Sequence, residues 1–142
     1  MQRPDNYVTF NKNIRLTTML ILYAEDDIED YSLFLEVLEF IQPGVECVNV
    51  VNGVEVLKFL DDCVLLPDYI FLDINMPAMD GKACLKAVKR DPRFKNIPVV
   101  IYTTSRNPLD QEFCIELGVS AYLPKPNTIA EAKASLQKIF IP

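Results

Sequence analysis

The sequence of 142 residues contains no histidine. Catalytic triads of the Ser-His or Cys-His kind are therefore excluded, and the chain cannot carry a phosphohistidine, so any phosphoryl group must come from outside. The four cysteines, Cys47, Cys63, Cys84 and Cys114, lie far apart and form no CxxC pair. This spacing excludes the usual zinc sites. Each cysteine has apolar neighbours, so we interpret all four as core or near-core thiols.

Long apolar runs and an excess of positive charge are also missing. No apolar stretch approaches the roughly 18–20 residues that a membrane span requires, and residues 1–17 lack the apolar segment of a secretory signal. The net charge of -6 argues against sequence-independent binding to DNA or to anionic lipid. The remaining composition, 50% hydrophobic and 24% charged, is typical of a soluble globular domain, which we expect in the cytoplasm.

Beyond a polar, irregular stretch at residues 1–17, interpreted as a flexible leader, short apolar runs alternate with segments of helical periodicity. The predicted strands are Met19–Ala24, Glu46–Val51, Tyr69–Asp73, Val99–Thr103 and Ala121–Pro124. The predicted helices are Asp30–Ile41, Val54–Asp62, about Gly81–Arg90, Pro108–Leu117 and Ile129–Phe140. Such alternation predicts one α/β domain over residues 18–142, with a doubly wound parallel sheet covered on both faces. Five βα units fit the flavodoxin-like strand order 2-1-3-4-5, which we take from that class of fold.

Polar residues end or follow four of these strands. Glu25-Asp26-Asp27 follows the first strand, Asp73 ends the third, Thr103 ends the fourth and Lys125 follows the fifth. Ligands of doubly wound sheets bind beyond the carboxyl ends of the strands. Carboxylates that converge there would repel each other unless a cation sat among them, and an all-oxygen cluster suits Mg²⁺.

Taken singly, each residue also has an ordinary structural interpretation. Asp26 or Asp27 could favour the start of a helix, Asp73 could be a turn residue, Thr103 a β-branched strand residue and Lys125 a solvated lysine. Their coincidence at four strand ends favours phosphoryl chemistry. Asp73 is then the nucleophile, while Mg²⁺ and Lys125 offset the charge on the transferred oxygens. The Thr103 hydroxyl could donate a hydrogen bond to the phosphoryl group.

The motifs ILYAEDDIED, FLDINMPAMDG, VVIYTTS and AYLPKP resemble those of the receiver domain of two-component response regulators, over about residues 19–141. The resemblance implies the following roles: Asp73 as phosphoacceptor, Glu25 and Asp26 as the acidic pair, Asn75 as a metal ligand through its backbone carbonyl, Thr103 as the switch hydroxyl, Lys125 as the phosphate-pairing lysine and Tyr122 as the aromatic switch residue. It also implies a cis Lys125–Pro126 bond, and positions that tune autodephosphorylation at Asn75 and Ser105.

Because no output domain follows, the resemblance implies a stand-alone regulator of the chemotaxis or relay type. It would accept its phosphoryl group from a histidine kinase or a phosphotransfer protein, catalysing only its own phosphorylation and dephosphorylation. Its output would be docking to a protein partner, through residues 110–117 and 121–138, with no nucleic acid or membrane involved.

Three other classes of protein share part of this pattern. A pseudo-receiver, acting as a phosphorylation-independent interaction module, normally lacks one of the acids, the threonine or the lysine, and none is missing here. A haloacid-dehalogenase-type phosphatase needs a second acid two residues after the nucleophile, where this chain has Asn75. A flavodoxin needs a hydroxyl- and glycine-rich loop after the first strand, where Glu25-Asp26-Asp27 would repel the FMN phosphate.

Overall fold

The computed structural model describes residues 19–140, and the proposed leader lies outside them. Its strands are β1 (Leu20–Ala24), β2 (Glu46–Val50), β3 (Tyr69–Leu72), β4 (Val99–Thr103) and β5 (Ala121–Pro124). Its helices are α2 (Ile28–Ile41), α3 (Gly53–Asp62), α4 (Gly81–Arg90), α5 (Pro108–Glu116) and α6 (Ile129–Phe140). No helix within residues 19–140 is long and apolar enough to cross a membrane.

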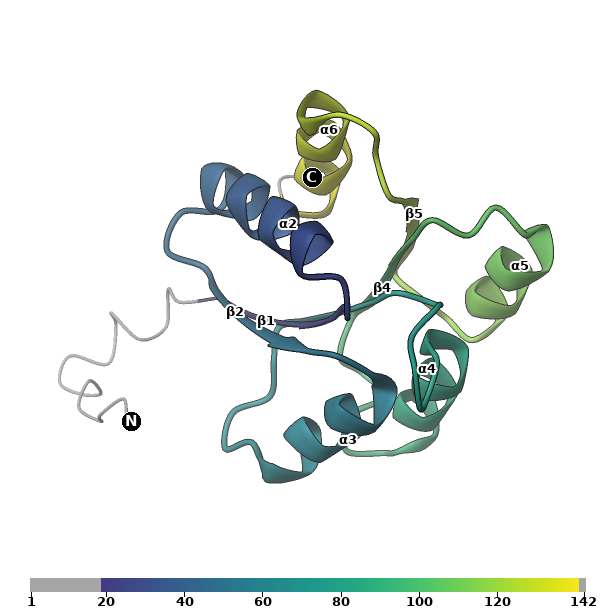
Figure 1. Ribbon diagram of the computed structural model, residues 1–142. Helices are drawn as coiled ribbons and strands as arrows, with labels where there is room; N and C mark the ends of the chain where they lie inside the picture. The colour runs from purple at the N-terminus through teal and green to yellow at the C-terminus, as the bar shows by residue number, and fades with distance from the viewer. Residues whose placement is uncertain (1–18, 141–142) are drawn as a thin grey trace, which may run out of the picture.

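The five strands form one parallel sheet in the order β2-β1-β3-β4-β5, which confirms the predicted topology. Figure 1 shows α2 and α6 on one face of the sheet and α3, α4 and α5 on the other. Each face has its own apolar core, and the strand residues alternate between the two. The core of the α2–α6 face is rich in aromatic rings, with Phe34 packed 4.4 Å from Tyr23 and 5.0 Å from Phe71 between ring centroids.

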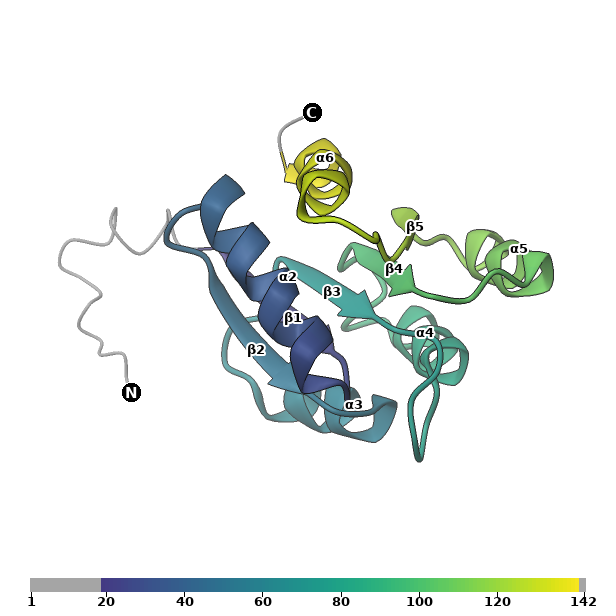
Figure 2. The ribbon, with the colours of Figure 1, turned by 45° about the horizontal axis from the view of Figure 1, so that its top comes forward.

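The strand register brings the carboxyl ends of the central strands together at one edge. Ala24 of β1 pairs with Leu72 of β3, and Thr103 of β4 pairs with Pro124 of β5. The residues that follow these pairs, among them Glu25 and Asp73, therefore emerge side by side. Figure 2 shows these strand ends with the loops that follow them.

The helices that follow the strands begin at the same edge, and polar side chains cap them. Asp27 caps α2, where its side chain accepts hydrogen bonds from the backbone N–H groups of Glu29 and Asp30. Since this cap includes Asp27, the helix begins at Ile28, two residues before the predicted start. Asn52 and Asp80 cap α3 and α4 in the same way.

Gly81 allows the β3–α4 loop to fold back against the end of β3. A Cβ at this position would overlap the carbonyl oxygen of Asp73 and would lie 2.8 Å from the Cα of Ile74. The Gly81 N–H donates a 2.8 Å hydrogen bond to the Ile74 carbonyl and so closes the loop. The Asp80-Gly81 pair has the composition of a turn that begins a helix, and close packing against the site is a second requirement for this glycine.

We expect Gly81→Ala to lower the free energy of unfolding by about 3 kcal/mol, because the new methyl group has to displace the backbone beside Asp73. Gly44→Ala is the control: nothing lies within 4 Å of a Cβ there, and the cost comes only from its φ of +84°. That cost is about 1 kcal/mol. Urea denaturation measures both, and equal losses would contradict the close-packing argument.

Candidate functional site

The ammonium group of Lys125 lies among three carboxylates at the carboxyl edge of the sheet. Its Nζ is 2.5 Å from Oε1 of Glu25, 2.8 Å from Oδ2 of Asp30 and 3.0 Å from Oδ2 of Asp73. The Lys125 N–H donates a 2.8 Å hydrogen bond to the Thr103 carbonyl, so the backbone after β5 is fixed to the end of β4. The structure thus brings together Glu25, Asp73, Thr103 and Lys125, the residues that the strand ends predicted.

Burial singles out this edge of the sheet. Tyrosines apart, Glu25, Asp73 and Thr103 are the polar or charged residues buried within residues 19–140, with exposed fractions of 2%, 5% and 0%. Charged side chains are rarely buried unless they are paired or bind a ligand. Their concentration at one point therefore makes this edge of the sheet the candidate functional site.

Glu25 is held in place from two sides. Its Oε1 accepts a 3.1 Å hydrogen bond from the Tyr23 hydroxyl, and its Oε2 accepts one of 3.1 Å from the Asp27 N–H. Burial raises the pKa of Glu25, while hydrogen bonds from Lys125 and the Asp27 N–H oppose that rise. Burial alone would lower the pKa of Lys125, but its hydrogen bonds to Asp30, Glu25 and Asp73 outweigh it and hold this pKa above its usual value.

Asp73 has one engaged and one free carboxylate oxygen. Oδ2 accepts the hydrogen bond from Lys125, whereas the buried Oδ1 has no hydrogen-bond partner among the described residues. A buried carboxylate oxygen without a donor is costly. This oxygen fits a divalent cation, which binds carboxylate oxygens and needs only one or two of them from the protein.

The other expected metal ligands do not converge at the same point. The side chains of Asp26 and Asn75 are exposed, and the described part of the chain contains no cluster of three or more acidic or cysteine side chains placed to hold a metal. The carboxylates that do converge, those of Glu25 and Asp73, meet at the Lys125 ammonium. A cation here would therefore share these oxygens with an internal positive charge.

Asp30 is a site residue that the sequence analysis missed. It lies in the first turn of α2, where acids are common because they interact favourably with the helix dipole. The favourable interaction with the helix dipole gives no reason to expect a contact with Lys125, which lies 95 residues further along the chain. The spacing of Asp30 from the cap residue Asp27 is the only signal in the sequence.

The peptide bonds of residues 19–140 are all trans, so the expected cis Lys125–Pro126 bond is wrong for this structure. The trans isomer is intrinsically favoured by about 0.5–1 kcal/mol before proline. Lys125 reaches its three carboxylate partners from the trans backbone, so the isomer is not needed to aim its ammonium.

Thr103 connects the acidic pocket, through its backbone carbonyl, to a second polar network, through its hydroxyl. Its Oγ1 accepts a 3.2 Å hydrogen bond from the Ser105 N–H. The Ser105 hydroxyl donates a 2.6 Å hydrogen bond to Oδ2 of Asp110 on α5, and Oδ1 of Asp110 lies 2.8 Å from Nζ of Lys82 on α4. We call Lys82, Asp110 and Ser105 the α4–α5 latch.

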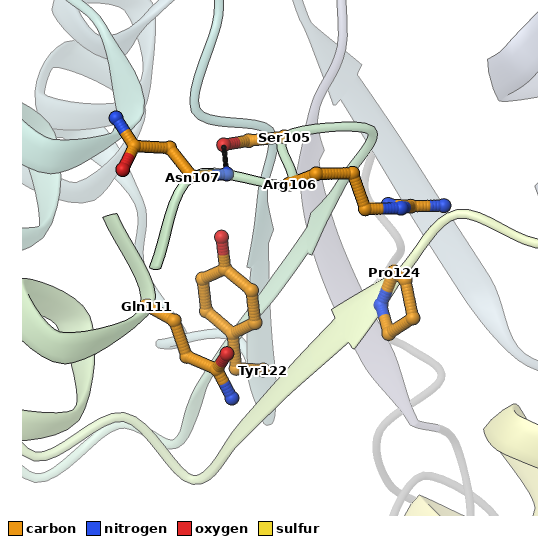
Figure 3. Close-up of a pocket in the computed structure, with 6 residues that line it drawn as sticks. All are labelled: Ser105, Arg106, Asn107, Gln111, Tyr122 and Pro124. Atoms are coloured by element: carbon orange, nitrogen blue, oxygen red, sulfur yellow. Dashed lines mark hydrogen bonds between the residues drawn. The ribbon is translucent and has the colours of Figure 1, made fainter. Parts of the chain in front are cut away.

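Beside the latch, a pocket of about 330 Å³ opens between the β4–α5 loop and β5. Its lining residues are Ser105, Arg106, Asn107, Gln111, Tyr122 and Pro124 (Figure 3). The Tyr122 ring stands in this pocket with its hydroxyl directed toward the loop (Figure 3). That hydroxyl is buried and forms no hydrogen bond of standard geometry in the described structure. Burial raises its pKa, and the nearby Ser105 side chain opposes that rise.

The cysteines lie in or near the core, as predicted. Cys84 and Cys114 are buried, Cys47 and Cys63 are partly buried, and all four are free thiols. Burial raises the pKa of the Cys84 thiol to about 12 and that of Cys47 and Cys114 to about 11. Thiols in this state are poor nucleophiles.

Residues 21–137 match the family model of the response regulator receiver domain. The chain belongs to this family. It is 34% identical over 125 residues to the response regulator Rcp1 of Synechocystis sp. (strain ATCC 27184 / PCC 6803 / Kazusa), covering 84% of this chain and 85% of Rcp1. It is also 34% identical over 119 residues to the transcriptional regulatory protein CpxR of Escherichia coli (strain K12), covering 84% of this chain but 48% of CpxR.

Solved structures show the same relationship. The phosphorylated cyanobacterial phytochrome response regulator RcpA superposes with a TM-score of 0.79 at 31% identity, covering 86% of this chain and 91% of RcpA. The Mn²⁺-bound form of Rcp1 superposes with a TM-score of 0.77 at 33% identity, covering 85% of this chain and 91% of that structure. The fold is therefore that of receiver domains, and this chain is a receiver of the Rcp1 type.

Tyr122→Phe removes a buried hydroxyl that interacts only weakly with the Ser105 side chain and forms no hydrogen bond of standard geometry, so we expect it to raise the free energy of unfolding by about 1 kcal/mol. Tyr23→Phe is the matched control, because that hydroxyl donates to Oε1 of Glu25. Its loss should cost about 2 kcal/mol, the value of a hydrogen bond to a charged group. Thermal or urea denaturation compares the two, and destabilisation by Tyr122→Phe would show that its hydroxyl is hydrogen-bonded.

The α4–α5 latch predicts a pH-dependent contribution to stability. Hydrogen bonds from Lys82 and Ser105 lower the pKa of Asp110. A lowered folded-state pKa contributes stability that is present above the unfolded-state value, about 3.9, and is lost as the pH falls through the folded-state value. Asp110→Asn should therefore be less stable than the wild type near neutral pH, and this difference should shrink in strong acid.

Urea denaturation over a pH series measures this difference. Asp62→Asn is the control, because Asp62 pairs with Lys58 in an exposed contact with side chains 67% and 76% exposed. Exposed pairs of this kind contribute little. A constant difference between wild type and Asp110→Asn across the series would refute the assigned role of the Asp110 carboxylate.

Proposed function

We propose that this chain accepts a phosphoryl group on Asp73, from a histidine kinase or a phosphotransfer protein, in a reaction that depends on Mg²⁺. Phosphorylation then controls docking to a protein partner. Membership of the receiver family supports the signalling role, and the buried Asp73 with one unpartnered oxygen is the observation that carries the assignment of the acceptor.

Asp73 is suited to be the nucleophile by its position and its partners. It follows β3 at the carboxyl edge of the sheet, 5% exposed, with one oxygen free of hydrogen bonds. A carboxylate has two oxygens, so one can hold the cation while the other attacks phosphorus. As this bond forms, the bond between phosphorus and the donor's leaving group breaks, and an aspartyl phosphate results.

Four groups would hold Mg²⁺, namely the side chains of Glu25, Asp26 and Asp73 and the backbone carbonyl of Asn75. Glu25 and Asp73 are buried at the site, and the exposed Asp26 adjoins Glu25. The relative Rcp1 has a Mn²⁺-bound form, which supports divalent-cation binding by this chain. When bound, the ion offsets negative charge on the transferred phosphoryl oxygens.

Lys125 and Thr103 would complete the reaction. The Lys125 ammonium, already 3.0 Å from Oδ2 of Asp73, can pair with a phosphoryl oxygen there. The Thr103 hydroxyl can donate to another phosphoryl oxygen. Since Oγ1 of Thr103 also accepts from the Ser105 N–H, its reorientation would alter the β4–α5 loop.

The face formed by α5, β5 and α6 is the proposed docking surface. It contains the pocket beside Tyr122, and the exposed Leu109 and Ile115 lie on α5, with 68% and 56% of their area exposed. Exposed apolar side chains on one face can contribute to a protein-binding surface. The loop that joins this face to Thr103 gives phosphorylation a direct route to it.

We expect the protein, with Mg²⁺ and acetyl phosphate, to gain one base-labile phosphoryl group in intact-mass spectra. Asp73→Asn should abolish this gain, because the amide is not a nucleophile for phosphorus. Asp61→Asn, an exposed acid on α3, is the control and should be phosphorylated like the wild type. Omission of Mg²⁺ should also abolish the gain.

Unchanged modification of Asp73→Asn would overturn the acceptor assignment. A wild type that neither gains a phosphoryl group nor responds to Mg²⁺ would instead favour the alternative, a pseudo-receiver that acts as a phosphorylation-independent interaction module. The spectra of the wild type and of Asp73→Asn therefore distinguish a phosphoacceptor at Asp73 from a pseudo-receiver.

A further inference from the structure

Lys125 contacts one carboxylate that the proposed reaction does not use. Its Nζ is 2.8 Å from Oδ2 of Asp30, whose N–H donates to the cap side chain of Asp27 at 3.2 Å. The side chain of Asp30 is 42% exposed, against 1% for Glu25 and 7% for Asp73. Asp30 is therefore the outermost of the three acids around the ammonium.

The two inner carboxylates are those expected to bind the cation. A divalent cation at Glu25 and Asp73 would bring positive charge to the oxygens that Lys125 contacts, and the two charges would repel each other. The ammonium would then have to weaken or give up these contacts. The Lys125 side chain is only 9% exposed, and a largely buried ammonium without a partner is unfavourable.

Asp30 is placed to resolve this conflict. We propose that Asp30 is a positioning residue that retains the Lys125 ammonium when a divalent cation occupies Glu25 and Asp73, and thereby increases the cation affinity of the site. The inference rests on the proposed function. With Glu25, Asp30 and Asp73 ionised, the three carboxylates around the ammonium leave a net charge of about -2 for the divalent cation to neutralise, and the exposed Asp26 adds a further negative charge nearby.

The arrangement also bears on the phosphoryl step. Asp30 lies outside the two inner carboxylates, yet the contact keeps the ammonium within reach of Asp73. A lysine retained in this way is already close to Asp73, so it can pair with a phosphoryl oxygen without first moving in from solvent. Asp30 acts only through Lys125, so its effect should disappear when the ammonium is absent.

Titration of the full chain with Mn²⁺ alone, followed by electron paramagnetic resonance, tests the inference. Asp30→Asn should weaken Mn²⁺ binding about fivefold, since a charge-assisted hydrogen bond that is partly exposed is lost. Glu29→Gln is the matched control. It removes the same charge from the same helical turn, and Glu29 is exposed and makes no ion pair with Lys125 within the described structure. Its effect should stay within about twofold.

A second background shows whether Asp30 acts through the lysine. Lys125→Met removes the competing ammonium, so it should tighten Mn²⁺ binding. In that background Asp30→Asn should have no larger effect than Glu29→Gln. In the presence of Lys125, Asp30→Glu keeps a carboxylate and should restore most of the affinity that Asp30→Asn loses.

Four outcomes would overturn the inference. Equal losses of Mn²⁺ affinity in Asp30→Asn and Glu29→Gln would show that only the overall negative charge matters. An equal loss of affinity for Asp30→Asn with and without Lys125 would show that Asp30 is a direct ligand of the cation. Mn²⁺ binding that Asp73→Asn abolishes but Asp30→Asn leaves unchanged overturns the inference alone. Mn²⁺ binding that is absent or insensitive to Asp73→Asn overturns the proposed function, and the inference with it.

Discussion

The ion pairs of Lys125 are the interaction on which the site depends. Glu25 and Asp73 are buried close together, and two carboxylates in that position could not both stay ionised without a nearby cation. Lys125 supplies the charge from the end of β5, and Asp30 adds a contact from α2. One side chain thus joins the residues after β1 and β3 to a helix and to the fifth strand, so removing it would leave buried charges unpaired.

The part of the site that lies at the ends of the strands could be predicted from the sequence. Short, wholly apolar runs indicate buried parallel strands, and the carboxyl ends of such strands meet at one edge. Glu25, Asp73, Thr103 and Lys125 each end or follow a strand, so the fold brings them together whatever the details of side-chain packing. The strand order came from the class of fold, and the register of β1 with β3 confirms it.

The remaining parts depend on contacts that periodicity does not specify. Asp30 is an ordinary first-turn acid by sequence, and only the fold, which brings the start of α2 to the carboxyl edge of the sheet, places it against Lys125. Lys82 and Asp110 are separated by 28 residues on two surface helices, where charged residues are expected without any pairing. The start of α2 was misplaced because Asp27 serves as a cap, although in sequence it continues an acidic run.

Thr103 is the residue at which the two polar networks meet. Its carbonyl accepts from the Lys125 N–H, on the side of the acidic pocket, and its hydroxyl accepts from the Ser105 N–H, on the side of the α4–α5 latch. If the Thr103 hydroxyl turned toward a phosphoryl oxygen, the hydrogen bond that it accepts from the Ser105 N–H would change. The Ser105 hydroxyl is in turn hydrogen-bonded to Asp110. A change at Asp73 would therefore reach the pocket beside Tyr122 through this short chain of hydrogen bonds. This route needs no movement of the sheet, because the loop between Thr103 and α5 begins where the pairing of β4 with β5 ends.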